Sequence, residues 1–248
     1  METLQTLKFY NRFREAVKKR TVDNMVVPVS GGLDSTLIVK ALHDNKDLDK
    51  CKFLCLCLNP FAEMVESRYD IFINHFEIEE QPNDNKLMVE ILEEPLYSKS
   101  VNFYLYKEIN RLGSRVSLSG LGADELFGGY DYYNTINYPR GLFEEIKAVT
   151  NEEKKERDLY FLIHHHLREN ERIGLYWEVE GRYPFLDKEV VKFNDVGKSM
   201  IKSILLEDFS NNFVNRQKTG FRIDDNKDRS HQRKEYLKQL EIWRGIFK

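Results

Sequence analysis

The chain has 248 residues, of which 41% are hydrophobic, 32% charged and 12% aromatic, a balance that fits a globular protein and excludes a disordered or fibrous one. Its formal net charge of −3 creates no overall field that would attract a nucleic acid or an anionic membrane. The sequence has no apolar stretch long enough to span a bilayer, and charges interrupt the apolar positions of residues 1–20, unlike in a secretory signal. We therefore expect neither a membrane nor a nucleic acid among its partners.

The cysteines are clustered in one apolar segment. Cys51, Cys55 and Cys57 all fall within CKFLCLCLN, a sequence typical of a buried strand. Small core residues are the simplest interpretation of all three, and they supply no paired framework for disulfides. This usage favours a reducing compartment and predicts a cytoplasmic protein.

The first half of the chain alternates short apolar runs with helical patterns. Such alternation is typical of parallel strands joined by crossover helices, and therefore predicts an α/β fold. The expected elements are, in chain order, an amphipathic helix over residues 3–20, a strand over Met25–Val29, a helix over Asp34–His43, a strand over Phe53–Leu58, a helix over residues 63–74, a weaker strand around His75–Ile78, a helix over Val101–Leu112 and a strand over residues 115–119.

The second half is expected to be helical, with no strand from about Asp131 onward. His164, His165 and His166 fall in this half as a possible metal tract, but neighbouring side chains on a helix point about 100° apart and cannot converge on one ion. We interpret the tract as a helix surface. The helical patterns lie around residues 142–149, 152–169, 188–194 and 199–210.

The two halves are expected to pack as one unit, because no repeat, low-complexity tract or flexible linker separates them. The first 20 residues form a helix of their own in this division. One domain then covers residues 21–225, with its sheet part ending near residue 130 and its helical part following. Residues 226–248 are expected to form a charged helix or tail.

The first candidate site is the sequence SGGLDS at residues 30–35. It follows a predicted strand and opens a predicted helix, so backbone N–H groups and the positive helix end converge where an anion can bind. The two glycines allow the backbone to approach phosphate oxygens, and the hydroxyls of Ser30 and Ser35 can donate further hydrogen bonds. A lysine at the place that a Walker A loop requires is absent. We interpret the loop as a phosphate-binding site, although a plain glycine turn with Asp34 as a helix cap is the alternative.

The second candidate site repeats the same arrangement later in the chain. The sequence SGLGADE, which begins at Ser119 and Gly120, again places small residues and carboxylates after a predicted strand. Ligands bind at this edge in open α/β sheets. If both strand ends face one crevice, Asp34 and Asp124 can share a magnesium ion that also binds triphosphate oxygens, because hard cations prefer oxygen ligands. The predicted cofactors are therefore ATP and Mg²⁺.

Four motifs together carry a family resemblance. The sequences SGGLDST, SGLGADELFGGY, EGRYPFLDKEVV and NRQKTGF, in this order and spacing, resemble the synthetase domain of asparagine synthetases and of their β-lactam and carbapenam synthetase relatives. The resemblance covers roughly residues 20–225. It implies a doubly wound parallel sheet of the Rossmann-like, adenine nucleotide alpha hydrolase type, with a helical carboxy-terminal half.

The resemblance also implies a reaction. ATP adenylates a small carboxylate substrate with release of pyrophosphate, and ammonia or an amine then displaces AMP to form an amide. Lys218, within NRQKTGF, matches a family lysine that neutralises phosphate charge during adenylation. Leu58 and Asn59 fall where the family binds adenine, to within a residue or two. By position, the pyrophosphate loop is matched by Ser30, Gly31, Gly32, Asp34 and Ser35, and the second magnesium carboxylate by Asp124.

The motif before PFLD carries charged residues with two interpretations. Arg182 and Asp187 are expected to form internal ion pairs that brace the helical half on the sheet. For Glu180, an ion pair and a catalytic role are about equally favoured, because ring-closing relatives use a glutamate of this motif for proton transfer. We therefore include Glu180 with Lys218 as a candidate catalytic residue.

The sequence departs from the family at Leu121. Asparagine synthetases typically carry SGEG where this chain has SGLG, and the family glutamate is thought to handle incoming ammonia, which leucine cannot do. The family's glutaminase half is also not expected, since Glu2 follows Met1 where that half places its catalytic cysteine. In both respects the chain resembles asparagine-synthetase-domain proteins. Its ammonia would then be supplied directly or by a separate glutaminase subunit.

Three functions stay open from the sequence. The leading hypothesis is an ATP-dependent amide synthetase, that is, an AMP-forming carbon–nitrogen ligase. The second keeps the ATP-pyrophosphatase step with another nucleophile, as in NAD synthetase, GMP synthetase or tRNA-modifying relatives, which lack LFGGY and PFLD. The third is a nucleotide-binding regulatory protein that has lost synthesis, and Leu121 is its only direct support.

Overall fold

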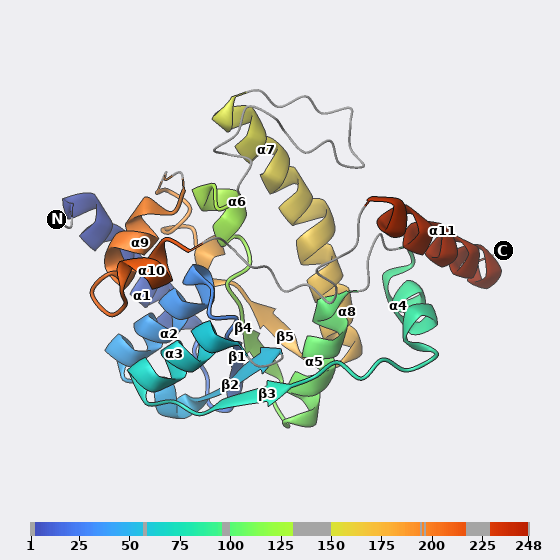
Figure 1. The fold of residues 1–248 in the computed structure, drawn as a ribbon, viewed down its shortest axis with the longest axis horizontal. Helices are drawn as coiled ribbons and strands as arrows, with labels where there is room; N and C mark the ends of the chain where they lie inside the picture. Colours follow the sequence, from blue (N-terminus) through green and yellow to red (C-terminus); the bar gives the residue numbers. More distant parts are fainter. Residues whose placement is uncertain are drawn as a thin grey trace.

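The computed structural model describes most of the chain. The described residues are 3–56, 59–95, 100–130, 150–193, 195, 197–216 and 229–247. Within them, helices surround one central sheet (Figure 1).

The sheet has five strands in the order β3-β2-β1-β4-β5, and every neighbouring pair is parallel. The chain therefore first builds the sheet outward in one direction from β1 and then continues in the other direction from the same strand. This is the strand order of a doubly wound fold, and it confirms the fold class predicted from the sequence. The strands are β1 (Met25–Pro28), β2 (Cys51–Leu56), β3 (Ile73–Phe76), β4 (Val116–Leu118) and β5 (Glu180–Arg182).

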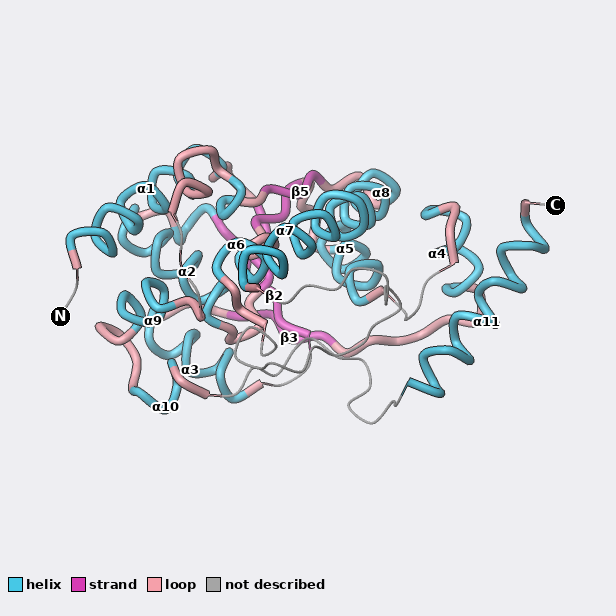
Figure 2. Tube along the Cα trace, turned by 90° about the horizontal axis from the view of Figure 1, so that it is seen from above, coloured by secondary structure: helices cyan, strands magenta, loops and turns pink. Residues whose placement is uncertain are grey.

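Helices cover both faces of this sheet, as the view in Figure 2 shows. Crossover helices of parallel strands must pack on one face or the other, which buries the sheet on both sides. The helices on one face are α1 (Leu4–Arg20), α2 (Leu33–Asn45), α3 (Pro60–Tyr69), α6 (Ala123–Phe127), α9 (Ser199–Leu205) and α10 (Asn211–Val214). Those on the other face are α4 (Asp84–Leu92), α5 (Val101–Arg111) and α8 (Arg168–Tyr176).

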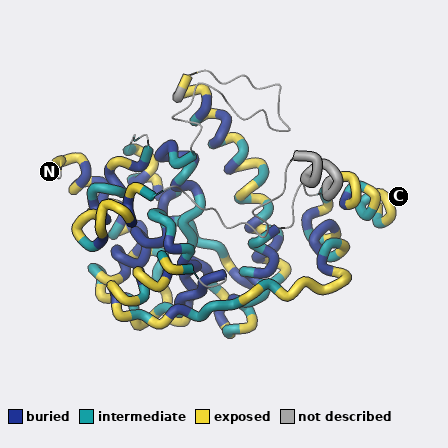
Figure 3. Tube along the Cα trace, viewed as in Figure 1, coloured by how far each residue is buried: buried dark blue, intermediate teal, exposed yellow. Residues whose placement is uncertain are grey.

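Alternation along the strands divides the core in two. Successive strand residues face opposite sides of a sheet. Met25 and Val27 accordingly pack in the core that contains α1 and α2, whereas Val26 and Leu54 pack in the core that contains α5 and α8. The buried segments gather around the sheet in Figure 3. Because both faces are buried, the strands carry near-continuous apolar runs, which is why they were predictable.

Most of the predicted elements are present. The structure has the opening helix, the strands of the first half and the closing helix α11 (Arg229–Ile246). The weaker strand expected around His75–Ile78 begins two residues earlier, at Ile73. Helix α4 was not predicted. It packs beside α11, where the Trp243 indole N–H donates to the carbonyl of Glu93 at 2.8 Å.

Two predictions in the second half are wrong, and a third gives a helix the wrong end. Strand β5 lies in the region where no strand was expected; it has three residues, Glu180, Gly181 and Arg182, and so too few apolar positions to show alternation. The helix expected over residues 188–194 is a series of turns, in which the N–H groups of Val190 and Val191 both donate to Asp187. The helix expected over residues 199–210 stops at Leu205. The helix expected over residues 142–149 lies outside the described residues.

A long helical run crosses the edge of the sheet (Figure 1). It begins with α7 (Asn151–Phe161), whose start is fixed by a capping box between Thr150 and Glu153. It continues through a π-helical segment, Leu162–Leu167 (η3), into α8. Single π turns inside α-helices occur often at functional sites. Two short 3₁₀ segments complete the described elements, Leu48–Lys50 (η1) and Pro184–Leu186 (η4).

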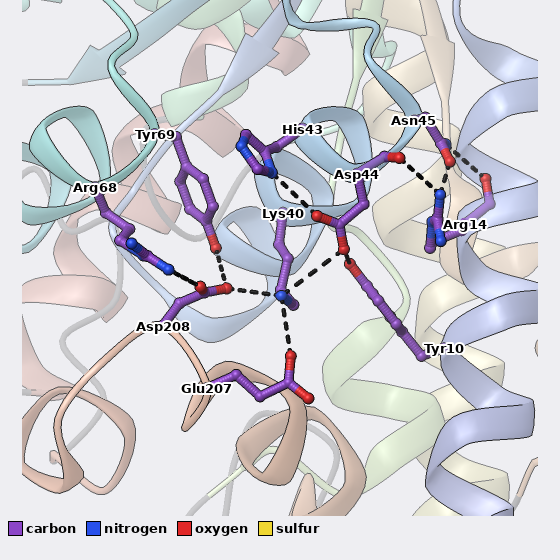
Figure 4. A network of polar contacts seen from close by, with 10 residues as sticks. All are labelled: Tyr10, Arg14, Lys40, His43, Asp44, Asn45, Arg68, Tyr69, Glu207 and Asp208. Carbon is purple, nitrogen blue, oxygen red and sulfur yellow. Dashed lines mark hydrogen bonds and ion pairs between the residues drawn. The ribbon is translucent and has the colours of Figure 1, made fainter.

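A polar network joins four parts of the fold (Figure 4). At its centre Lys40 of α2 donates to Asp208, just after α9, at 2.7 Å. Asp208 also accepts a hydrogen bond from the Tyr69 hydroxyl of α3 at 2.9 Å and is paired with Arg68. The Tyr10 hydroxyl of α1 extends the network by donating to Asp44 of α2 at 2.6 Å. We call the residues labelled in Figure 4 the Lys40 network.

The helices of the described residues are all too short or too polar to cross a membrane.

Candidate active site

The candidate site lies at the carboxyl ends of β1 and β4. These strands are neighbours although β2 and β3 intervene in the sequence, so the point between them is where the strand order reverses. Open α/β sheets bind ligands at this position because the following loops diverge to opposite faces. A cavity of about 630 Å³ opens there, large enough for a nucleotide or a substrate of similar size.

The first loop is built around two serines. Ser30 and Ser35 hydroxyls lie 3.2 Å apart, and the N–H of Gly32 donates to the Ser30 hydroxyl at 3.2 Å. Helix α2 begins at Leu33 with Gly32 as its cap, so the cap residue has no side chain that could hydrogen-bond to the first turn of the helix. Its first-turn N–H groups and positive dipole end face the cavity, as anion binding requires.

Gly31 is needed for the position of this loop. Its φ of +67° lies in the left-handed region, and a Cβ atom there would come within 2.6 Å of the backbone nitrogen of Ala62. The loop therefore packs directly on the start of α3. Asn59 fastens the same contact, because its side-chain amide donates to the carbonyl of Ser30 at 2.9 Å and its oxygen caps α3.

The second loop lies against the first. A Cβ atom on Gly120 would come within 2.9 Å of the Cβ atom of Asp34, so the two strand-end loops can approach this closely only with glycine there. Ser119 holds the loop to the sheet, since its N–H donates to Arg182 of β5 at 2.9 Å. The structure thus brings Ser119, Gly120 and Asp124 together with the Ser30 loop along one cavity.

Asp34 and Asp124 converge on a residue that the sequence did not single out. The Nζ atom of Lys198 lies 2.5 and 2.6 Å from the two carboxylate oxygens of Asp34 and 2.6 Å from Oδ1 of Asp124. Burial by itself lowers the pKa of Lys198, but the two carboxylates outweigh burial and raise the pKa above its ordinary value. Lys198 is therefore an ammonium ion, and its side chain is only 6% exposed.

The convergence of these carboxylates fits a magnesium site. Two carboxylates directed at one point supply the hard oxygen ligands that Mg²⁺ prefers, and the ion usually completes its shell with phosphate oxygens and water. No group of three or more His, Cys, Asp or Glu side chains arranged for a metal is present among the described residues. The two described carboxylates therefore suit a metal that arrives with a triphosphate, whose oxygens would complete the ligand shell.

The acidic pair of the second loop is divided between two roles. Asp124 faces the cavity, whereas its neighbour Glu125 is buried and accepts a hydrogen bond from the Tyr130 hydroxyl at 2.7 Å. Burial raises the pKa of the Glu125 carboxyl despite this hydrogen bond. The glycines of LFGGY make room nearby: a Cβ atom on Gly129 would come within 2.1 Å of Asp124 and 2.2 Å of Lys198.

Arg216 also reaches the first loop, which the sequence did not reveal. Its guanidinium lies between the rings of Phe61 and Phe213, at 3.9 and 4.4 Å from their centroids, and donates to the carbonyl of Gly31. Burial lowers the pKa of Arg216. This residue precedes Lys218 by two positions, so the motif NRQKTGF does begin at the candidate site.

Part of the cavity wall is apolar. Leu121, at the position of the family glutamate, lies in the wall together with Val101 and Leu105 of α5. Asn170 and His166, from the two sides of the π-helical transition, add polar groups. His164 and His166 are exposed on the helix surface, as expected, although His166 lies on the side that borders the cavity.

Glu180 is placed apart from these residues. It lies at the amino end of β5, its carboxylate is 61% exposed, and it pairs with Arg182 at 2.9 Å. It borders a separate surface hollow with Lys19 and Arg20 and is absent from the described residues that line the large cavity. The structure does not bring Glu180 together with the nucleotide loops, and its proton-transfer role stays a prediction.

Arg182 and Asp187 make contacts with the opening helix, whereas ion pairs that brace the helical half on the sheet were expected. Arg182 donates to the carbonyl of Arg20 at 2.8 Å, and Asp187 pairs with the Arg20 guanidinium at 2.8 Å. The two contacts fasten the end of α1 to β5 and to the segment that follows it. Among the other predicted site residues, Leu58 and Lys218 lie outside the described residues.

The residues that the sequence did not reveal have one feature in common. Lys198, Lys202 and Arg216 all come from the helical half and reach the cavity from the turns around α9 and α10. No periodicity distinguishes them from surface cations, because the fold alone brings these turns over the ends of β1 and β4. Only Arg216 had a sequence signal, its place in a recognised motif.

Comparisons with known proteins agree with this geometry. The family model described as asparagine synthase matches residues 8–162, more than half of the chain. Glutamine-hydrolyzing asparagine synthetase 3 of Arabidopsis thaliana is 29% identical over 209 residues, which are 73% of this chain and 33% of that protein. A Methanocaldococcus jannaschii protein provisionally named glutamine-hydrolyzing asparagine synthetase 1 is 32% identical over 189 residues, 70% of this chain and 32% of its own length.

The similarity also has a defined extent. The Zea mays glutamine-hydrolyzing asparagine synthetase is 29% identical over 207 residues, 72% of this chain and 33% of that protein. The chain thus spans about a third of the length of these relatives. The matched residues include both strand-end loops with Asp34 and Asp124. From this match, this sheet order and these loops, the chain belongs to the asparagine synthase family.

Proposed function

We propose that the chain is an ATP-dependent amide synthetase, an AMP-forming carbon–nitrogen ligase. One observation carries the proposal: Asp34 and Asp124, from neighbouring strand ends, converge beside the serine-glycine loop at the wall of one cavity. This arrangement can hold a triphosphate and a metal ion at one end of the cavity and a second substrate at the other.

The first half-reaction is adenylation. A carboxylate oxygen of the substrate attacks the α-phosphorus of ATP, the bond to the bridging oxygen breaks, and pyrophosphate leaves. The loop at Ser30 and the start of α2 bind the leaving pyrophosphate through N–H and hydroxyl groups. Arg216 keeps that loop in place through the carbonyl of Gly31. Lys218 is proposed to add positive charge to the phosphates.

Magnesium fits the same end of the cavity. Asp34 and Asp124 would be its ligands, and the ion would supply charge neutralisation for the departing pyrophosphate. Precise positioning of the reacting groups does much of the remaining work, because the site has to hold two substrates in line.

The second half-reaction takes place toward Leu121. The nitrogen of ammonia or an amine attacks the acyl carbon, AMP leaves, and the nitrogen loses a proton. The apolar wall of Leu121, Val101 and Leu105 suits a neutral nucleophile better than a charged one. A separate glutaminase subunit is one proposed source of ammonia, and free ammonia or an amine is the other.

The thiols of the described strand support a reducing, cytoplasmic setting as part of this proposal. Cys51 and Cys55 lie in β2, and burial raises the pKa of Cys51 to about 12. A thiol with such a pKa is a weak nucleophile at neutral pH, which fits a core residue.

Exchange of labelled pyrophosphate into ATP tests the proposal, because it reports adenylation whatever the final nucleophile is. The assay is run with magnesium and a panel of small carboxylates that includes aspartate, in the absence of any amine. We expect exchange that depends on one carboxylate, followed by amide formation when ammonia or an amine is added. Exchange without amide formation would favour another nucleophile. ATP binding without exchange for any carboxylate would favour a regulatory nucleotide-binding protein.

A further inference from the structure

Lys198 holds both predicted magnesium ligands of this chain. Its ammonium group lies within 2.6 Å of three carboxylate oxygens, two from Asp34 and one from Asp124. Those oxygens are the same atoms that a magnesium ion would need. A lysine at this place therefore competes directly with the metal for its ligands.

The surrounding backbone is arranged for this lysine. Lys198 caps α9 with a φ of +58°, a left-handed conformation that is unfavourable for a residue with a side chain. Its N–H donates to the carbonyl of Phe127, and the N–H of Gly197 donates to the carbonyl of Gly128. The turn before α9 is therefore docked on the LFGGY turn. Any side chain on Gly129 would collide with the Lys198 stem.

The charges of Lys198 and the two carboxylates predict how this cluster responds to a nucleotide. Two carboxylates and one ammonium carry a net charge of −1, and a divalent cation cannot join them without close repulsion from the ammonium. A triphosphate offers Lys198 a more strongly charged partner in the same cavity, which Lys198 already lines. Transfer of the ammonium from carboxylates to phosphate oxygens would free both ligands at the moment when the metal and the phosphates arrive together.

We propose that Lys198 occupies the magnesium position of the protein without nucleotide and moves to the triphosphate when metal and nucleotide bind. This inference rests on the proposed use of ATP and magnesium, and it adds that binding of the two is coupled through one lysine. Divalent metal alone then binds weakly, and the nucleotide site is not blocked by free metal.

Lys202 provides a matched control for charge. It lies one helical turn further along α9 and lines the same cavity, but it takes no part in the contacts between Lys198 and the two carboxylates. Lys202→Met therefore removes one positive charge from the cavity and leaves Lys198 in contact with both carboxylates. Lys198→Met removes the same charge and takes the ammonium group away from them.

The test measures binding of Mn²⁺ alone, by electron paramagnetic resonance, to the full chain without nucleotide. We expect Lys198→Met to bind Mn²⁺ at least about tenfold more tightly than wild type, and Lys202→Met to change the affinity by less than about threefold. Lys198→Arg, which keeps the charge, should resemble wild type. Equal Mn²⁺ affinity in Lys198→Met and wild type would show that Lys198 is only a brace and would overturn the inference.

The wild-type protein gives a second measurement that needs no variant. Its dissociation constant for Mn²⁺ without nucleotide should be on the order of 1 mM, and saturable binding at micromolar Mn²⁺ would also overturn the inference. Neither titration contains ATP or a carboxylate substrate. Failure of the pyrophosphate exchange assay would therefore refute the amide synthetase proposal. The Mn²⁺ titrations would still test the role of Lys198 separately.

Discussion

Lys40 and Lys198 are both buried lysines held by acidic side chains, and they lie on the same side of the sheet. Lys40 contacts Asp208 at 2.7 Å, Glu207 at 3.2 Å and Asp44 at 3.8 Å, and its side chain is 8% exposed. Lys198 contacts Asp34 and Asp124 at 2.5 to 2.6 Å, and its side chain is 6% exposed. Burial alone does not separate the two clusters.

The carboxylates around Lys40 have many other donors. Asp208 accepts hydrogen bonds from Tyr69 and Arg68 in addition to Lys40, and Asp44 accepts one from Tyr10 (Figure 4). These donors come from three helices, so each carboxylate joins several elements. The described residues of the Lys40 network are all absent from the lining of the large cavity.

The carboxylates around Lys198 are placed differently. Asp34 and Asp124 follow neighbouring strand ends, where side chains face a ligand rather than another helix. Strained backbone at Lys198 and a glycine at position 129 accompany this cluster. Position at a strand end, strain and an open cavity therefore distinguish an ion pair that can be exchanged from one that fixes the fold.

The comparison is tested most strongly by removing one carboxylate from each cluster. Asp34→Asn and Asp124→Asn should each lower the rate of magnesium-dependent pyrophosphate exchange by about 100- to 1,000-fold, because a ligand that neutralises leaving-group charge is lost. Circular dichroism should show an unchanged fold, since Lys198 keeps the other aspartate. The matched variant Asp208→Asn should keep an exchange rate within about threefold of wild type.

Either of two results would contradict this difference between the two clusters. Wild-type exchange in Asp34→Asn or Asp124→Asn would remove the metal assignment. A loss of exchange in fully folded Asp208→Asn would show that the Lys40 network takes part in catalysis.

The next largest effect concerns stability. Lys40→Met leaves the carboxylates of Asp44, Glu207 and Asp208 without their shared cation and should lower the free energy of unfolding by about 3 kcal/mol, measured by urea denaturation. Lys198→Met should also destabilise the protein, but there a magnesium ion can take the place of the ammonium. Mg²⁺ at ten times its dissociation constant should restore about 1.4 kcal/mol to Lys198→Met and nothing to Lys40→Met. Restoration in both variants, or in neither, would contradict the distinction.

Lowering the pH should have a smaller effect on stability, and this effect arises in the Lys40 network. Burial by itself raises the pKa of Asp208, but hydrogen bonds from Lys40, Arg68 and Tyr69 outweigh it and hold the pKa below its ordinary value. A carboxyl whose pKa is lowered on folding stabilises the protein above its unfolded pKa of about 3.9 and loses that contribution as pH falls through the folded pKa. Wild type should therefore be more stable than Asp208→Asn at neutral pH.

This difference should shrink once the pH falls below about 4, as the urea midpoint measured at a series of pH values would show. A difference that stays constant down to about pH 2.5 would mean that the Asp208 charge does not contribute through its lowered pKa.

The two lysine clusters also show how far the sequence could predict the molecule. Short apolar runs that alternate with helical patterns identified β1, β2 and β4, because strands buried on both faces carry a strong apolar signal. The strand-end loops with Asp34 and Asp124 were predictable because glycines and carboxylates follow two such strands, within motifs that resemble those of a known family. Confirmation of the family then followed from the matched residues.

The remaining site residues could not be predicted because they depend on long-range contacts. Lys198 lies 164 positions after Asp34 in the chain and meets it only because α9 docks beside α2. Strand β5 likewise exists only through its pairing with β4, since EGR has no strand pattern of its own. Local sequence reveals elements that are stabilised by their own burial pattern, and it does not reveal those that are stabilised by their neighbours.

The smallest expected effect concerns Glu180, which the family resemblance made a candidate for proton transfer. A general base has to come within hydrogen-bond reach of the proton that it removes. Glu180 is instead 61% exposed beside Arg182, and the Arg182 hydrogen bond lowers the pKa of its carboxyl, which weakens it as a base. From this placement we expect Glu180→Gln to change adenylation and amide formation by less than about twofold.

The measurement separates the two half-reactions, with pyrophosphate exchange for adenylation and single-turnover amide formation for aminolysis. If Glu180 moves to the acceptor during the reaction, Glu180→Gln will slow aminolysis alone, and the rate of that step will lose its dependence on the pH range in which the carboxyl titrates. If Glu180 acts only through its ion pair with Arg182, both half-reactions will keep their rates. The amine then has to arrive neutral at the wall formed by Leu121, and aminolysis will accelerate with pH as the free amine becomes populated.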